Sequence, residues 1–436
     1  MKMKFVISSP FDLMGIFIKS FPPFAMILIV ATTKIFYVCS CYNKQMTGNI
    51  TRWRTLACIW LLIFSVYASV LSTSVVLNEI SQEIGLTASQ AGLVLSAPLI
   101  MLAIFAFVGG LFGDRVGSKR TAGIGGIIFS VSSIMRGLSS DFFVLLAFSL
   151  LLGIGWGLVY PNLPKLVKAW FGRVGTPTGI YSTGIFIGCT MGLAATPSLI
   201  HPYAGSWRGV FYIWGVMALL IALLWWVLAG EPSGRKREVQ TERHLEWGLF
   251  KNRHIWLVAI FFGLAGNMTF YVVSGWFPTF FMEKGISESA SAFMTSLVTM
   301  VSIPSVFLIP FLSDRSGRRR PYMWVSCIVA AAAFAVMITG PQEFYWALMV
   351  IIGITLTATF IMGLILPVEL VGEERGAAAS GLVISIGYII GALGPWIAGQ
   401  LKEMTSSLSS SILMLVVVLI FSSGLVLALP ETGRRS

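Results

Sequence analysis

Charged residues are scarce in this chain of 436 residues: Asp, Glu, Lys and Arg make up 11% of it, against 56% for hydrophobic residues. A soluble domain carries about 25% charged residues, so this chain cannot cover a globular surface with polar groups. Its mean hydropathy is +0.85, and apolar runs of about 20 residues, the length that a bilayer core requires, recur along almost the whole sequence. The sequence therefore predicts an all-α protein that crosses a membrane many times.

The chain also lacks the clusters that carry metal or cofactor chemistry. Its five cysteines have no spacing typical of a disulfide or zinc framework, and its three histidines are scattered. No nucleotide-binding loop is present, and no cluster of His, Asp and Glu faces either membrane surface. We therefore expect no metal, no cofactor and no enzymatic activity.

The net charge of +12 could suggest nucleic-acid binding. The Lys and Arg residues, however, lie in short loops between apolar runs, which is typical of the positive-inside rule of membrane proteins. We expect the lipid bilayer as the partner, no nucleic acid, and a monomer.

Twelve apolar runs are long enough to be membrane spans. They form two six-helix halves, residues 51–229 and 254–436 with a short tail, joined by a basic linker at 230–253. The predicted spans are 56–78, 88–112, 121–138, 142–164, 176–199, 208–229, 254–275, 289–312, 321–339, 343–367, 376–399 and 408–430. Residues 1–50 precede them as an extension, whose apolar run is interrupted by Lys34. Three interpretations stay open: an extra span, an uncleaved signal-like segment, or an upstream stretch with translation starting near Met46.

Orientation follows from counting Lys and Arg in alternate loops. One set of loops, with the central linker and both ends of the twelve-span body, holds 21 of these residues, and the opposite set holds four: Arg136, Arg208, Lys284 and Lys402. The positive-inside rule places the richer set in the cytoplasm. We expect an integral protein of the plasma membrane whose body begins and ends on the cytoplasmic side.

A short charged motif occurs once in each half. The first, Gly110–Arg120, reads GLFGDRVGSKR and separates spans two and three; the second, Asp314–Arg320, reads DRSGRRR and separates spans eight and nine. Asp114 and Asp314 lie 200 residues apart, which indicates that the halves are copies of one unit. We call these motifs the first and second hinge.

The first hinge resembles the signature loop of the major facilitator superfamily (MFS). The resemblance covers residues 52–432, and shorter stretches around Gly153–Pro164 and Arg375–Pro395 resemble the organic-anion and cyanate–nitrate branches. It implies a secondary transporter that moves a small solute by alternating access, with the hinge near the start of span eleven, at residues 374–378, as a gate. The residues that this assigns to gating are Gly110, Asp114, Arg115, Gly117, Lys119, Arg120, Asp314, Arg315 and Gly317. Since Pro310 replaces the leading glycine of the second hinge, we expect the second gate to be the looser one.

The resemblance also implies that spans one, four, seven and ten line a central path. The polar and aromatic residues predicted to face the substrate there, together with one in span eleven, are Tyr67, Ser74, Trp156, Tyr160, Asn267, Tyr271, Thr355 and Tyr388. A buried amide or hydroxyl without a partner costs several kcal/mol in lipid. A structural alternative stays open, because Ser and Thr can bond to their own helix and Tyr and Trp also anchor at interfaces.

The substrate class is less constrained. Arg136 and Lys165, at opposite mouths of the path, could attract a small organic or inorganic anion. Ser149 and Trp156 stand where the anion branch often has an arginine and a glutamate, so efflux of neutral or apolar compounds, or a sensor that transports nothing, is the alternative. No Asp or Glu lies at mid-depth in a predicted span, which leaves uniport, exchange and symport with a weak acid open.

Overall fold

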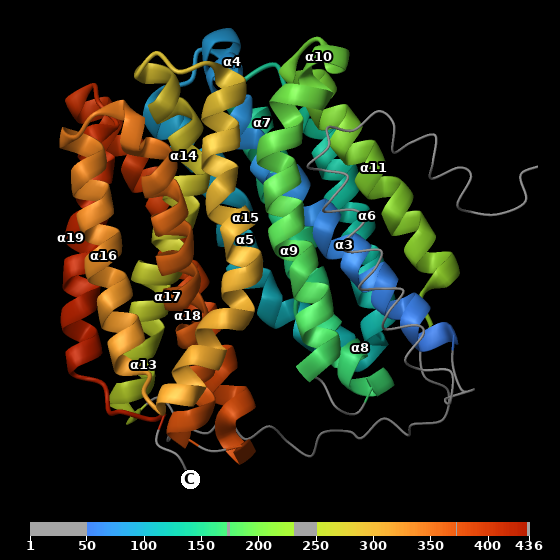
Figure 1. Ribbon diagram of the computed structural model, residues 1–436. Coiled ribbons are helices and arrows are strands. Elements are labelled where there is room, and N and C mark those ends of the chain that lie inside the picture. The colour runs from blue at the N-terminus through green and yellow to red at the C-terminus, as the bar shows by residue number, and fades with distance from the viewer. Residues whose placement is uncertain (1–49, 172–174, 231–250, 372, 434–436) are drawn as a thin grey trace, which may run out of the picture. The chain divides into compact units, whose positions relative to one another are not determined.

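The computed structural model describes residues 50–171, 175–230, 251–371 and 373–433, and over these ranges the protein is built from helices without strands (Figure 1). The predictions for residues 1–50 and for the central linker lie almost entirely outside the described residues. The first half is coloured blue to green in Figure 1 and the second half yellow to red. The predicted all-α membrane fold is confirmed.

The first half contains six long helices. These are α3 (Ile50–Val75), α5 (Ala88–Val116), α6 (Ser118–Arg136), α7 (Phe142–Val159), α9 (Gly175–Ala195) and α11 (Trp207–Leu228). Short helical segments complete it: α4 (Leu77–Ile84), α8 (Asn162–Phe171), the π-helical turn η1 (Thr196–Ile200) and α10 (His201–Ala204).

The second half repeats this plan. Its first span is divided into α13 (Arg253–Phe261), the π-helical turn η2 (Phe262–Met268) and α14 (Thr269–Glu283). The others are α15 (Glu288–Ser316), α16 (Arg320–Thr339), α17 (Tyr345–Val371) after the short η3 (Gln342–Phe344), α18 (Glu373–Thr405) and α19 (Ser409–Leu427).

Eleven helices within the described ranges are long and apolar enough to cross a bilayer. The predicted span at 121–138 corresponds to α6, which is a helix but is not among the eleven, because it is rich in Gly and Ser and carries Lys119, Arg120 and Arg136. Small residues allow membrane helices to approach closely. A Cβ atom on Gly155 of α7 would lie 2.7 Å from the carbonyl oxygen of Gly125 in α6, so α6 is held by close packing against its neighbours.

Local signals in the sequence start and stop these helices. Thr87 caps α5 in a capping box with Gln90, and the Asp141 carboxylate accepts hydrogen bonds from the first amides of α7. At the hinges the chain reverses through Gly117 and Gly317, whose φ angles of 109° and 64° suit glycine best. Gly117 and Gly317 are therefore required by the backbone.

The halves pack against each other along α5 and α18, which run in opposite directions. A Cβ on Gly92 would lie 2.4 Å from the carbonyl oxygen of Pro395, and one on Gly399 would lie 2.3 Å from that of Ala88. At the other end of α18, a Cβ on Gly381 would meet no atom within 4 Å. The contact is thus tight at the end opposite the hinges and opens toward the end that carries them, which we call the hinge end.

A glycine-to-alanine substitution tests the packing of α6. We expect Gly155→Ala to lower thermal stability, by about 1–3 kcal/mol, because its Cβ would lie 2.5 Å from the Phe129 backbone nitrogen. Gly424→Ala is the matched control, since that position in α19 has open space around it, and it should keep or slightly raise stability. The measurement is the unfolding midpoint of each purified variant. Equal midpoints for Gly155→Ala and Gly424→Ala would contradict the close packing of α6 against α7.

Candidate functional site: the central path between the halves

Aromatic side chains from both halves meet at the centre of the protein. Tyr67 of α3 packs edge-on against Trp156 of α7, with ring centroids 5.1 Å apart. Tyr388 of α18 lies 6.0 Å from Tyr160 and 6.4 Å from Tyr271 of α14, again between ring centroids, and donates its hydroxyl to that of Tyr160 at 3.4 Å. The structure thus brings five of the eight predicted path residues into one buried cluster.

Asn267 lies elsewhere, in the π-helical turn η2. Its Nδ2 donates to the Phe262 carbonyl oxygen of the same turn at 3.2 Å, and the residue is 1% exposed. Gly391 of α18 provides the room, because a Cβ there would be 2.5 Å from the Asn267 Cβ. Single π-helical turns are frequent at functional sites, but in this conformation the Asn267 amide serves its own backbone.

Two other predicted path residues also bond to their own helices. Ser74 donates its hydroxyl to the Leu71 carbonyl at 2.7 Å, and Thr355 donates to the Ile351 carbonyl at 2.9 Å. The Trp156 indole is fully buried, and its N–H has no hydrogen-bond partner among the described residues. The role of all three in substrate contact stays a prediction.

A small cavity adjoins the tyrosine cluster on the side away from the hinges. Its volume is about 20 Å³, room for about one water molecule. Residues of both halves line it: Val70, Leu71, Thr73, Ser74, Val94, Leu95, Pro98, Leu99, Arg136, Tyr271, Ser274, Gly275 and Pro395. Ser74 and Tyr271 are the predicted path residues among them.

Arg136 is the charged residue in this wall. The sequence predicts it at a mouth of the path, and the structure places it at the last turn of α6 with an exposure of 1%. Its Nη2 donates to the Thr73 hydroxyl of α3 at 2.8 Å, and its guanidinium lies over the Phe211 ring of α11, 4.2 Å from the centroid. Neither Thr73 nor Phe211 was a sequence candidate; a basic residue at the end of a Gly- and Ser-rich helix was the available signal.

The first hinge is held within its own half. Lys165 of α8 donates to the Asp114 carboxylate at 2.6 Å and to the Gly110 carbonyl at 2.7 Å, and Asn162 donates to the Gly109 carbonyl at 2.8 Å. The Asp114 side chain is 50% exposed and that of Lys165 is 28% exposed. Lys165, predicted to attract an anion, is therefore engaged with the hinge, and the predicted contact of Asp114 with residues 374–378 stays a prediction.

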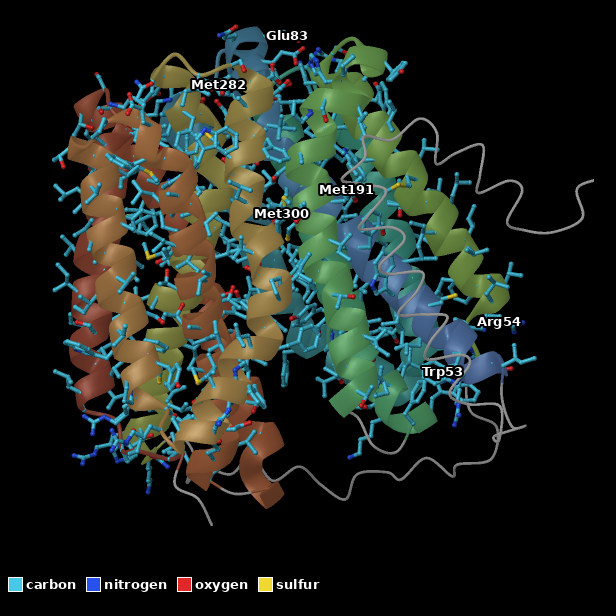
Figure 2. The ribbon with its side chains drawn as sticks, in the orientation of Figure 1. Trp53, Arg54, Glu83, Met191, Met282 and Met300 are labelled. Atoms are coloured by element: carbon cyan, nitrogen blue, oxygen red, sulfur yellow. The ribbon has the colours of Figure 1, made fainter. Side chains whose placement is uncertain are left out.

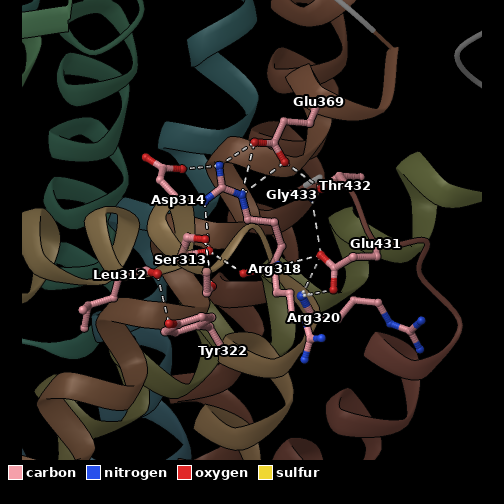
Figure 3. Close-up of polar contacts among 12 residues, drawn as sticks. Leu312, Ser313, Asp314, Arg318, Arg320, Tyr322, Glu369, Glu431, Thr432 and Gly433 are labelled. Carbon is pink, nitrogen blue, oxygen red and sulfur yellow. Dashed lines mark hydrogen bonds and ion pairs between the residues drawn. The ribbon is translucent and has the colours of Figure 1, made fainter. Parts of the chain in front are cut away.

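The second hinge forms a denser network (Figure 3). Arg319, with a side chain 9% exposed, binds Asp314 at 2.6 Å and Glu369 of α17 at 2.7 Å, and Ser313 accepts from it at 2.9 Å. Thr432 of the C-terminal segment donates to Glu369 at 2.6 Å. Arg319, which follows the motif's glycine, thus bridges two carboxylates within the second half. The expectation that the second hinge is the looser gate stays a prediction.

The other predicted gating residues lie around these contacts. The Lys119 carbonyl accepts from the Trp225 indole at 3.0 Å, whereas Arg115 and Arg120 are exposed. Within the described ranges, no group of three His, Cys, Asp or Glu side chains could hold a metal ion. The arrangement is that of a path between two helical halves, with paired charges at both ends.

Two six-helix halves that enclose a partly polar path between them define a membrane transporter. The profile of the Major Facilitator Superfamily matches residues 59–395, so the chain belongs to this family, as its first hinge predicts. Family and relatives are transporters and not enzymes.

Similar proteins span nearly the same length. The chain is 28% identical over 365 residues to the uncharacterized transporter YycB of Bacillus subtilis (strain 168), covering 82% of this chain and 89% of that protein. It is 26% identical over 343 residues to the cyanate transport protein CynX of Escherichia coli (strain K12), covering 77% and 86%. The fold matches a bacterial homologue of the human lysosomal transporter Spinster, in an inward-facing and occupied conformation, with a TM-score of 0.77 and 18% identity over 87% of this chain and 97% of that one.

Replacing one basic residue in each hinge network tests whether the second hinge contributes more to stability than the first. We expect Arg319→Gln to lower stability by about 1–3 kcal/mol, since it leaves the Glu369 carboxylate, 25% exposed, without its cation, whereas Asp314 is 61% exposed and stays solvated. Lys165→Gln should cost only about 0–1 kcal/mol, because the pair that it breaks is largely exposed. Unfolding midpoints of both purified variants give the comparison; a larger loss for Lys165→Gln would contradict it.

Proposed function

We propose that this protein is a secondary transporter that moves a small anion across the plasma membrane by alternating access. The hinge end faces the cytoplasm in this proposal, as the distribution of Lys and Arg predicts. The two halves rock about the central tyrosine cluster, and the solute binds between them.

One observation carries the proposal: hydrogen bonds between the halves gather at the end opposite the hinges. Ser89 of α5 donates its backbone N–H to the Glu403 carboxylate of α18 at 3.0 Å, and Trp396 donates its N–H to the Ser96 hydroxyl at 3.1 Å. Asn78 donates to the Met282 sulfur at 3.9 Å, and Figure 2 shows Met282 at that end, with Arg54 at the hinge end. At the hinge end, by contrast, Asp114 is half exposed and pairs within its own half.

Further toward the middle, α9 and α15 run side by side. Thr190 and Thr299 share a hydrogen bond of 2.8 Å between their hydroxyls, and Figure 2 shows the neighbouring Met191 and Met300 on the two helices. The contacts between the halves therefore extend from the far end to the centre. This is the arrangement expected of a carrier closed on its external side.

Helices α5 and α18, which pack against each other between the halves, each provide a carboxylate near one end of the protein. Glu403, near the end of α18, accepts a hydrogen bond at the start of α5, where unpaired amides and the helix dipole favour a negative charge. Asp114, near the end of α5, would meet the start of α18 in the same way when the cytoplasmic side closes. In this proposal the carrier alternates between the two contacts, so that one end opens as the other closes.

The relatives and one internal charge support an anion as the solute. The relative in Escherichia coli is named for the transport of cyanate, and Arg136 places a buried cation beside the path. Efflux of neutral compounds remains the second candidate, favoured by the otherwise apolar and aromatic lining of the path.

Flux into reconstituted vesicles tests the function. We expect vesicles that contain the full-length protein and hold the same unlabelled anion inside to take up labelled small anions, because a carrier that alternates between its two sides moves solute in both directions. Protein-free vesicles are the control. Uptake of neutral compounds alone would establish the second candidate, and no flux across a broad panel of anions and neutral solutes would refute a transport function.

Substituting Glu403 tests the external contact. We expect Glu403→Gln to weaken closure of the far end by about 1 kcal/mol, about a fivefold shift in population, and so to reduce the thiol labelling of Gly381→Cys at the hinge end. Glu283→Gln is the matched control, since Glu283 pairs with Lys402 of its own half at 2.7 Å. The labelling rate of the protein without the added cysteine is subtracted as background. Equal labelling rates in Glu403→Gln and Glu283→Gln would contradict the role of Glu403.

A further inference from the structure

The cavity on the far side of the tyrosine cluster contains a buried charge that no described carboxylate neutralises. We propose that Arg136 binds the transported anion directly, that the site takes compact monovalent anions, and that the carrier therefore works by exchanging one such anion for another. This inference rests on the proposed transport function and deepens it.

The contacts of Arg136 leave most of its hydrogen-bonding capacity unused. Nη2 donates to the Thr73 hydroxyl, while Nε and Nη1 are buried and have no hydrogen-bond partner among the described residues. The Phe211 ring covers a face of the guanidinium and leaves the donors at its edge free. An isolated charge in an apolar interior costs several kcal/mol or more, so a guanidinium held in this way requires an anionic partner from outside the chain.

The position of Arg136 makes a transported anion the fitting partner. The cavity that it lines also contains Tyr271 and Ser274 of α14 and Pro395 of α18, so it is built from both halves. A ligand there contacts the surfaces that must separate when the far end opens. An anion bound at this place would thus be released or captured by the rocking motion itself.

The remaining lining restricts the class of anion. Seven lining residues are apolar and without side-chain donors: Val70, Leu71, Val94, Leu95, Pro98, Leu99 and Pro395. Ser74 and Ser274 already donate their hydroxyl protons to carbonyls of their own helices, and the Tyr271 hydroxyl is engaged with Tyr388 and Tyr67. This leaves the Arg136 edge and the Thr73 hydroxyl for a ligand. One cation and one hydroxyl suit a single negative charge on few atoms. A sugar acid would leave several hydroxyl groups unpaired, at about 1–3 kcal/mol each.

Exchange follows from the charge of the empty site. When an anion is bound, the guanidinium is neutralised and the loaded carrier can pass through a closed intermediate. An empty carrier would have to keep the charge of Arg136 buried without an anionic partner among the described residues, which is costly. The return step is therefore fast only with a second anion on board.

The test uses the purified full-length protein and two probes, nitrate and methanesulfonate. Both are anions of strong acids, so they do not cross vesicle membranes as neutral acids. In detergent, we expect each probe to raise the unfolding temperature by mass action, and gluconate and sulfate to leave it unchanged. In vesicles clamped at zero potential, uptake of labelled methanesulfonate should be at least tenfold faster when the interior holds methanesulfonate than when it holds gluconate.

Three variants assign these effects to Arg136. Arg136→Gln should lose the rise in unfolding temperature and the acceleration by internal methanesulfonate, whereas Arg136→Lys keeps the charge and should retain part of both. Arg208→Gln is the matched control, since Arg208 pairs with Glu83 at the same end of the protein and is not part of the cavity wall. It should behave as the unchanged protein does.

Each contrary result has a distinct meaning. Anion uptake that is equal with both vesicle interiors overturns exchange, and full activity of Arg136→Gln overturns the site, while both leave the transport function intact. No rise in unfolding temperature with either probe, or an equal rise with sulfate, overturns the ligand class. If Arg136→Gln does not fold, Arg136→Lys still tests the site and the comparison of vesicle interiors still tests exchange. Absence of flux for every solute would instead refute the proposed transport function.

Discussion

The interior of a bilayer offers no hydrogen-bond partners, and this constraint governs nearly every polar side chain described here. Serine and threonine meet it by donating to carbonyls of their own helix, as Ser74 and Thr355 do. Tyrosine meets it at the centre, where Tyr160 and Tyr388 join the halves through their hydroxyls. Trp156 and Arg136 are exceptions beside the path, and Arg136 is the charged one of the two, since two of its three guanidinium nitrogens are buried without a partner among the described residues. An unpaired buried charge is a good indication of a ligand.

The same constraint explains how the halves meet. Because lipid provides no hydrophobic driving force between helices, close backbone approach has to supply the contact. Gly92 and Gly399 allow α5 and α18 to touch at one end, and Glu403 adds a charged hydrogen bond there. At the hinge end the charges are paired within each half, Asp114 with Lys165 and Asp314 with Arg319. Contacts that form at one end only are what a two-state carrier requires.

The two hinges differ although their sequences are related. In the first, one largely exposed pair holds Asp114, and a weak pair of this kind is easily exchanged for another partner. In the second, Arg319 bridges Asp314 and Glu369, and the C-terminal segment closes over Glu369 through Thr432. The second hinge is thus suited to hold its half together, and the first to form and break contacts.

The helical membrane fold, the division into repeated halves and the family follow from hydropathy, charged loops and the hinge motif, because these are local properties of the chain. The sequence also identified the aromatic residues that meet at the centre, since helical spacing places Tyr67, Tyr160 and Tyr271 on inward faces. Only the tertiary structure decided that Arg136 lies inside the path and that Lys165 is engaged by Asp114. Both depend on which helix lies beside which, and these contacts join residues that no local pattern of the sequence connects.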